Sequence, residues 1–106
     1  GLGVFAASPA SDFIAIGANS NQNIIDPDHI VASMLKRVDV AAYDIVKAAL
    51  EGDLQVGSEM VLGLEDEGIG YTLDGSNIKV PEDVVEKLEE IKEKIIAGEI
   101  QVPVEL

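Results

Sequence analysis

One stretch, FIAIGANSNQNIIDPDHIVASMLKRVD at residues 13–39, constrains the fold more than any other part of the chain. It opens with the apolar run Phe13–Ile16, closed by Gly17, which is typical of a strand buried on both faces in a mainly parallel sheet. A second β-prone run, Ile30–Leu35, follows the turn Asp26–Asp28 and predicts a second strand. Side chains that follow such strands lie at the edge where α/β proteins bind small molecules. The pattern therefore predicts an α/β fold and a ligand binder, not a catalyst.

Two amphipathic stripes predict helices after the second strand. The first has Asp39 in its first turn, where an acidic side chain suits the helix dipole, and Gly52 at its C-terminal cap. The second begins at Pro81 and ends before Gly98. The apolar residues of the stripes recur at intervals of three and four: Val38, Ala42, Ile45 and Ala49 in the first, and Val84, Leu88, Ile91 and Ile95 in the second.

Two other segments carry weaker patterns. Val4–Ala7 favours one or two helical turns that end near Pro9, because proline lacks a backbone donor, and Ser8–Asp12 then reads as a loop. Met60–Leu62 and Ile69–Thr72 flank an acidic turn and predict a hairpin or two sequential edge strands.

Length and composition indicate one α/β domain over residues 1–106, with 47% apolar residues. Seven basic against twenty acidic residues give a net charge of -13, which repels phosphate backbones and makes nucleic acid a poor partner. No cysteine is present, so disulfides and thiolate metal sites are excluded. No apolar run approaches the roughly eighteen residues of a membrane span, and no signal pattern opens the chain, so we expect the chain itself to be soluble.

The sequence offers no convincing catalytic or metal constellation. The single histidine, His29, lies in a turn with acidic neighbours, and no GxSxG elbow supplies a serine for it to activate. Three consecutive carboxylates, Glu65–Glu67, lack the alternating spacing of a calcium loop and read as a solvated acidic turn. We therefore expect no enzymatic activity, no metal and no cofactor. Gly1 and Gly3 form a bare GxG, a weak match to a phosphate-binding fingerprint.

The polar run Ala18–Asn23 after the first predicted strand has two interpretations. It is a solvated loop, or its amides Asn19 and Asn21 hold a polar ligand at the strand end, since such side chains both donate and accept hydrogen bonds. Lys36 and Arg37 stand where the second predicted strand ends. Lys36 is either a second ligand contact or a plain surface lysine.

These residues together resemble the C-terminal part of the basic membrane protein family, nucleoside-binding lipoproteins that serve ABC transporters. The likeness extends in order over nearly the whole chain. Its segments are GLGVF, AIGANSNQN, IVASMLKRVDVAAYDIVKAALEG, LGLEDEGIGYTL and VPEDVVEKLEEIKEKIIAGEIQVP. The resemblance implies part of a type I periplasmic-binding-protein fold, in which two α/β lobes hold a purine or other nucleoside between them.

The resemblance also implies roles for particular residues. The family's IGVDSDQ turn corresponds to residues 16–22 and places its ribose-binding acidic residue at Asn19, a departure that loses a charge-assisted hydrogen bond. Its SxxK strand end corresponds to Ser33–Lys36 and favours Lys36 as a ligand contact. The start resembles a GGTG-type loop, which would bring Gly1 and Gly3 to the ligand. Pro9 is a second departure, because relatives usually have a helix there.

The family's first lobe, its lipid-anchoring cysteine and its base-stacking aromatic residues would lie upstream of Gly1. We therefore expect an extracytoplasmic, membrane-anchored full-length protein in which this chain supplies one wall of a cleft, with a nucleoside, the upstream lobe and an ABC permease as partners. Two alternatives remain: a regulatory or sensor module built on the same lobe, and a stand-alone α/β protein, an enzyme or a homo-oligomer that covers its exposed apolar surface with another copy.

Overall fold

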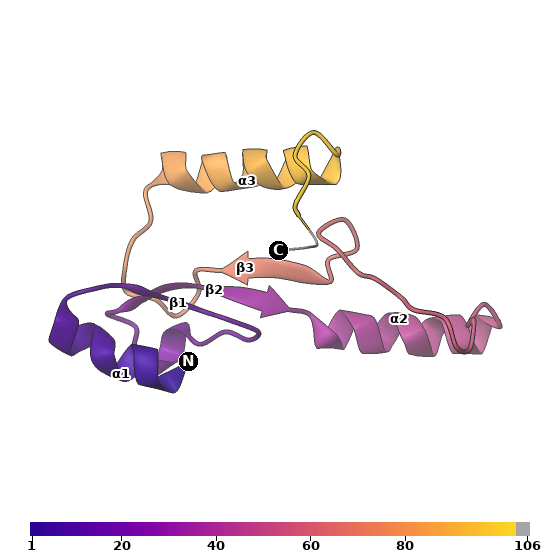
Figure 1. Cartoon of the computed structure of the whole chain (residues 1–106), viewed down its shortest axis with the longest axis horizontal. Helices are drawn as coiled ribbons and strands as arrows, with labels where there is room; N and C mark the ends of the chain where they lie inside the picture. The colour runs from indigo at the N-terminus through magenta and orange to yellow at the C-terminus, as the bar shows by residue number, and fades with distance from the viewer. Residues whose placement is uncertain (104–106) are drawn as a thin grey trace.

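The computed structural model describes residues 1–103 as three helices, a short 3-10 turn and three strands (Figure 1). In chain order they are α1 (Leu2–Ser11), β1 (Ala15–Gly17), η1 (Asn23–Ile25), β2 (Ile30–Lys36), α2 (Val38–Glu51), β3 (Ile69–Thr72) and α3 (Glu82–Ile96).

The three strands form one sheet in the order β1-β2-β3. β1 runs parallel to β2, with Gly17 opposite Ser33, and β3 runs antiparallel on the other side of β2, with Thr72 opposite Ser33. The predicted α/β class is confirmed, and the sheet contains one parallel and one antiparallel pair. β2 is the central strand and pairs with β1 on one edge and with β3 on the other.

The second predicted strand and both predicted helices are confirmed. β2 extends one residue past the predicted run, to Lys36. α2 ends at Gly52, whose φ of 80° is the left-handed cap that glycine adopts without strain. α3 follows Pro81 and carries Glu82 and Asp83 in its first turn and Lys94 in its last, as the helix dipole favours.

The predicted end of the first helix is wrong. α1 continues through Pro9 to Ser11, and Asp12 caps it in the left-handed conformation, with a φ of 52°. Proline removes only its own backbone donor. Ser8, which precedes it, bonds to residues that follow it: the Ser8 carbonyl accepts the Asp12 N–H, and the Ser8 hydroxyl donates to the Phe13 carbonyl. Ser8 is buried, so these bonds are shielded from water.

The predicted strand at Met60–Leu62 is also absent, and no hairpin joins it to Ile69–Thr72. The Gly63 N–H instead donates to Asp66 Oδ2 at 3.0 Å, and the Gly68 N–H donates to the Gly63 carbonyl at 2.9 Å. These bonds close a loop between the two segments. β3 finds its partner in β2, which offers a longer edge than Met60–Leu62.

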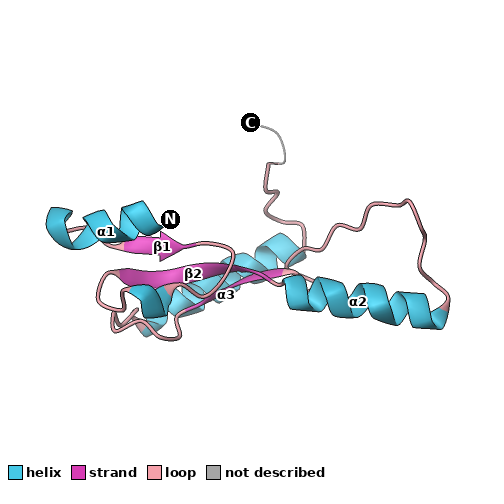
Figure 2. Ribbon diagram, turned by 90° about the horizontal axis from the view of Figure 1, so that it is seen from below, coloured by secondary structure: helices cyan, strands magenta, loops and turns pink. Residues whose placement is uncertain are grey.

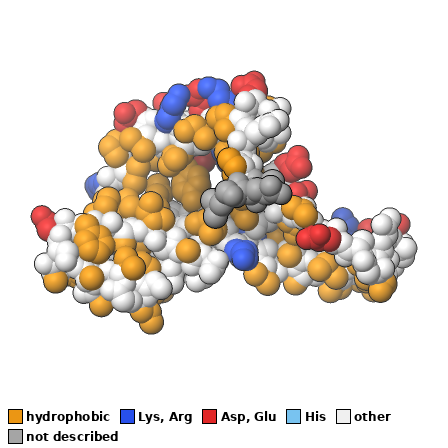
Figure 3. Space-filling view, in the orientation of Figure 1, with side chains coloured by type: hydrophobic (Ala, Val, Ile, Leu, Met, Phe, Trp, Pro, Cys, Tyr) orange, Lys and Arg blue, Asp and Glu red, His pale blue; other side chains and the backbone are white. Residues whose placement is uncertain are grey.

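Few apolar side chains are buried. Phe5, Ala15 and Ile30 are the buried apolar residues within the described chain, where α1 meets β1 and β2. The expectation that the first strand is buried on both faces is wrong here, because Ile14 is 62% and Ile16 68% exposed. Nothing within residues 1–103 covers that face. Figure 3 shows how widely hydrophobic side chains reach the surface on the face that it presents.

The molecule is extended, not compact. It measures 52 × 30 × 28 Å, with a radius of gyration of 16.9 Å, against about 13 Å for a compact chain of this length. Its accessible surface is 7968 Å², whereas a compact monomer of this mass exposes about 5,700 Å². α2 projects beyond the sheet in both ribbon views and has no buried residue (Figures 1 and 2). No helix in residues 1–103 combines the length and hydrophobicity needed to cross a membrane.

Candidate ligand-binding site

The structure brings Asn19 and Lys36 together. The loop Ala18–Gln22 leaves β1 and passes the end of β2, where the Lys36 N–H donates to the Asn19 carbonyl at 2.9 Å. Asn19 has a φ of 73°, a left-handed conformation that asparagine tolerates better than most residues. Both residues are exposed, so their side chains are accessible at this edge of the sheet.

The neighbouring basic residue is engaged elsewhere. The Arg37 guanidinium donates to both carboxylate oxygens of Asp39, with Nη2–Oδ2 at 2.8 Å and Nε–Oδ1 at 3.0 Å. These hydrogen bonds lower the pKa of Asp39 and raise that of Arg37. Within residues 1–103 the Lys36 side chain has no ion-pair partner. Of the basic pair, Lys36 is therefore the residue with an ammonium group to offer a ligand.

The other predicted site residues lie differently. Asn21 turns toward the end of β3, where its Nδ2 donates to the Asp74 carbonyl at 3.1 Å. Gly1 lies beside the loop, since a Cβ added to it would be 3.8 Å from Gln22 Nε2. A Cβ added to Gly3 would have no other atom within 4 Å, so Gly3 borders open space. The structure thus groups Asn19 with Lys36, sets Gly1 beside the last residue of the same loop and turns the Asn21 side chain toward the segment after β3.

Gly17, Asn23 and Ser33, for which the sequence predicts no contact with this loop, hold it in place. Ser33 Oγ accepts the Gln22 N–H at 3.0 Å and donates to Asn23 Oδ1 at 2.7 Å. Gly17 makes room for them, because a Cβ there would collide with Ser33 Oγ and lie 2.9 Å from Gln22 Cβ. The available signal was faint: a serine in an otherwise apolar strand, and an asparagine that ends a run of amides.

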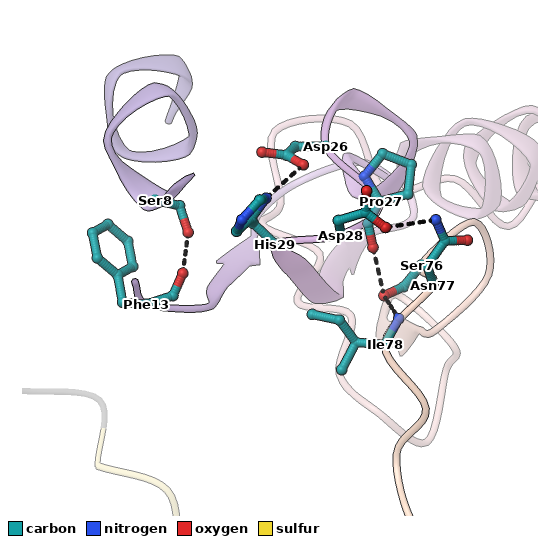
Figure 4. Close-up of polar contacts among 9 residues, drawn as sticks. All are labelled: Ser8, Phe13, Asp26, Pro27, Asp28, His29, Ser76, Asn77 and Ile78. Atoms are coloured by element: carbon teal, nitrogen blue, oxygen red, sulfur yellow. Dashed lines mark hydrogen bonds and ion pairs between the residues drawn. The ribbon is translucent and has the colours of Figure 1, made fainter. Parts of the chain in front are cut away.

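A second polar cluster ties the turn before β2 to the segment after β3. Asn77 donates its backbone N–H to the Pro27 carbonyl and its Nδ2 to Asp28 Oδ1, both at 2.8 Å. Figure 4 shows this contact together with His29, whose Nδ1 lies 2.9 Å from Asp26 Oδ1. His29 is therefore paired with Asp26 within its own turn. The cluster joins two chain segments far apart in sequence, the turn before β2 and the segment after β3.

The larger hollows lie elsewhere. An open groove of about 680 Å³ runs between α3 and the β2–β3 pair, lined by Met34, Leu35, Tyr71, Leu88, Ile91 and Ile95. A shallow acidic hollow brings residues 65–67 opposite Asp39 and Asp44. Neither contains Asn19 or Lys36. No cluster of three or more metal-ligating side chains occurs within residues 1–103.

The chemistry available at the Asn19–Lys36 edge is recognition. An amide donates and accepts hydrogen bonds, and an ammonium group donates up to three. Both residues are exposed, and neither lines an enclosed pocket in the described part of the chain. Such an exposed edge suits a neutral polar ligand with hydroxyl or carbonyl groups.

The fold and this site define a class of protein. The crystal structure of a solute-binding protein of an ABC transporter system from Aeropyrum pernix K1 is similar to this chain, with a TM-score of 0.71 and 27% sequence identity. The similarity covers 98% of this chain and 38% of that one. The chain therefore has the fold of part of an ABC solute-binding protein.

The chain belongs to the Bmp family, described as PnrA-like substrate-binding proteins of ABC transporters, whose model matches residues 1–105. It is similar to basic membrane protein D of Borreliella burgdorferi, with 32% identity over 106 residues that make up 97% of this chain and 31% of the relative. A CD4+ T-cell-stimulating antigen of Listeria monocytogenes is 38% identical over 73 residues, 69% of this chain and 20% of the relative. An uncharacterized lipoprotein of Pyrococcus furiosus is 34% identical over 101 residues, 82% of this chain and 25% of the relative.

The chain therefore spans about a third or less of the length of these curated relatives. The family resemblance inferred from the sequence is confirmed. Members of the family are described as substrate-binding proteins of ABC transporters.

Proposed function

We propose that residues 1–106 supply one wall of a nucleoside-binding cleft in an ABC-transporter solute-binding protein. Asn19 bonds a ribose hydroxyl, and Lys36 donates to a second polar group of the same ligand. Gly1, Gly3 and Asn21 lie at the margin of the site. A second lobe covers the opposite side of the nucleoside, and an ABC permease receives it.

One observation carries this proposal: the Lys36 N–H is bonded to the Asn19 carbonyl while Arg37 is held by Asp39. The backbones that carry one amide and one ammonium side chain therefore meet beyond the carboxyl ends of two parallel strands. This is where α/β sheets bind small molecules. The net charge of -13 opposes polyanionic ligands, and a nucleoside carries no phosphate.

The extended shape of the described residues favours the presence of a second lobe. The described residues expose far more surface than a compact monomer, and the groove under α3 is lined by apolar side chains. Apolar surface of this extent is stable in water when another part of the protein covers it. We infer that this cover is the second lobe, and that the whole protein is anchored outside the cytoplasm as a lipoprotein.

The test is titration calorimetry of inosine against the complete native protein and its Lys36→Ala variant. A hydrogen bond that involves a charged group contributes about 1.5–3 kcal/mol, so we expect the variant to bind about 10- to 100-fold more weakly. Lys79→Ala removes an exposed lysine away from the site and serves as the control. Equal affinities for all three proteins would remove Lys36 from the site, and no binding by the native protein would exclude inosine as the ligand.

The exposed apolar faces also favour a second candidate, a self-associating module in which another copy of the chain covers them. The intact mass of the native protein, captured from its source cells, separates the two. A mass about three times that of this chain supports the two-lobe receptor. A mass equal to this chain, with a dimer in sedimentation, supports self-association.

A further inference from the structure

Asn23 is a buried amide whose hydrogen-bonding groups are all used. It is 0% exposed. Its Nδ2 donates to the Asp74 carbonyl at 2.8 Å and to the Thr72 carbonyl at 3.2 Å, and its Oδ1 accepts from Ser33 Oγ at 2.7 Å. A buried amide in this state has one favourable orientation, because a flip would turn its oxygen, an acceptor, toward the carbonyl oxygens of Thr72 and Asp74. Asn23 therefore joins the centre of β2 to the end of β3 in a fixed geometry.

The bond to Ser33 continues into the loop that carries Asn19. Ser33 Oγ accepts the Gln22 N–H at 3.0 Å, and Gln22 Oε1 accepts the Ala18 N–H at 2.9 Å. Ala18 and Gln22 are the first and last residues of the loop. One chain of bonds from Asn23 thus holds both ends of the loop, and Asn19 lies between them.

A second path from Asn23 reaches the same loop. Its backbone N–H donates to Asn21 Oδ1 at 3.0 Å, and Asn21 Nδ2 donates to the Asp74 carbonyl at 3.1 Å. The Asp74 carbonyl therefore receives two amide groups, from Asn21 and Asn23. The loop is fixed from the β2 side through Ser33 and from the β3 side through Asp74.

These contacts differ from those of an ordinary core. The apolar core at Phe5, Ala15 and Ile30 would fold β1 against β2 without dictating the path of residues 18–22. The polar network does dictate it, since each bond is directional. Its outcome is a left-handed Asn19 whose carbonyl meets the Lys36 N–H.

We propose that Asn23, acting through Ser33 and Gln22, is the residue that positions the Ala18–Gln22 loop for ligand recognition by Asn19. This inference rests on the proposed nucleoside-binding function. Asn23 itself is buried and does not touch the ligand. Its role is to set the position of Asn19 relative to Lys36, and so the selectivity for ribose hydroxyls.

The first experiment measures selectivity in the complete native protein. Asn23→Asp keeps the size of the side chain but turns an oxygen toward the carbonyls of Thr72 and Asp74. We expect the preference for inosine over 2′,3′-dideoxyinosine to fall about tenfold. Gln55→Glu makes the same change of charge at an exposed amide of the α2–β3 segment, whose side chain has no hydrogen bond within residues 1–103, and keeps the wild-type preference. A variant that loses affinity for both nucleosides by the same factor would overturn the positioning role.

The second experiment needs no ligand and uses Ser33→Ala, a smaller change in case Asn23→Asp fails to fold. We expect hydrogen exchange at the Ala18 and Gln22 amides to speed up at least about tenfold, while the amides of the β2–β3 ladder keep their protection. Unchanged exchange at Ala18 and Gln22 would overturn the proposal. Failure of inosine to bind the native protein would instead count against the proposed function, and the exchange experiment would still decide the role of the network.

Discussion

The family resemblance implies an acidic residue at the position of Asn19, and the geometry of Asn19 makes the consequence testable. The backbone of Asn19 is held in place by Lys36 and by the hydrogen bonds of the loop. A substitution of its side chain should therefore leave the path of the backbone unchanged. An ionised acceptor makes a hydrogen bond about twice as strong as a neutral one. We predict that Asn19→Asp strengthens inosine binding by about tenfold in calorimetry.

The control for this substitution is Gln55→Glu, which adds the same charge at an exposed amide of the α2–β3 segment whose side chain has no hydrogen bond within residues 1–103. Its affinity should equal that of the wild type. Weaker binding by Asn19→Asp would mean that the ligand presents an acceptor, not a hydroxyl donor, to this position, and the ribose assignment would be wrong.

Glu90 is the residue with the largest change in acidity on the α3 surface. Lys87 Nζ lies 2.7 Å and Lys94 Nζ 2.5 Å from its carboxylate oxygens, and their hydrogen bonds lower its pKa from 4.5 to about 2. A depressed pKa in the folded state stabilises the helix above about pH 4.5, and this contribution disappears as the pH falls toward 2. Both ion pairs of Glu90 are exposed, so their contribution to the stability of the helix is small and is screened by salt.

We predict that Glu90→Gln reduces the loss of α3 helicity between pH 4.5 and 2, measured by carbonyl NMR shifts of α3 residues in 20 mM and 500 mM salt. Glu86→Gln, at an exposed position of α3 without an ion pair in the described chain, should leave the acid transition of the wild type in place. Identical acid transitions in the wild type and Glu90→Gln would show that the lysine contacts do not form in solution.

At the scale of elements, prediction succeeded where a local pattern determines the outcome. β2, α2 and α3 follow from an apolar run, helical spacing and caps at Gly52 and Pro81. It failed where distant partners decide. Pro9 stays within α1 because Ser8 bonds to Asp12 and Phe13, and Met60–Leu62 forms no strand because β3 pairs with β2. Neither partner is visible in the local sequence.

One side-chain bond ties α3 to the sheet. Tyr71 Oη, on β3, donates to Glu89 Oε1 on α3 at 2.7 Å, which raises the pKa of Tyr71 and lowers that of Glu89. α3 has no buried residue, so a single directional bond matters more than it would in a packed helix. We predict that Tyr71→Phe speeds hydrogen exchange in α3 while the β2–β3 ladder keeps its protection.

Tyr43→Phe is the matched control, since Tyr43 lies on α2 and is 68% exposed. Its exchange pattern should equal that of the wild type. If α3 exchanges at the same rate in both variants, α3 is held by its own apolar side chains Leu88, Ile91 and Ile95, which line the groove, and not by the tyrosine.

At the scale of the whole molecule, the sequence predicts a candidate site but not the hydrogen bonds that support it. The ends of β1 and β2 and the pair Asn19 and Lys36 could be inferred from strand patterns and from the family resemblance, although their contact with a ligand remains a prediction. The buried roles of Asn23 and Ser33 could not. Burial of these two residues depends on which strands flank β2. From sequence alone, a serine or an asparagine is expected to be exposed, because most residues of these types are. Likewise, the exposure of Ile14 and Ile16 depends on what covers β1, which no stretch of this chain determines.

The open shape leads to a prediction about the isolated 106-residue chain. Tight binding of a small ligand requires that most of its surface be buried, and Asn19 and Lys36 offer one exposed wall. We predict that the isolated chain binds inosine at least about 100-fold more weakly than the complete native protein and binds an apolar dye more strongly, because the groove under α3 is open. Calorimetry and dye fluorescence of both proteins in the same buffer measure the two effects. If the isolated chain matched the complete protein in inosine affinity, one wall would suffice for recognition, and the two-lobe cleft would be unnecessary to explain binding.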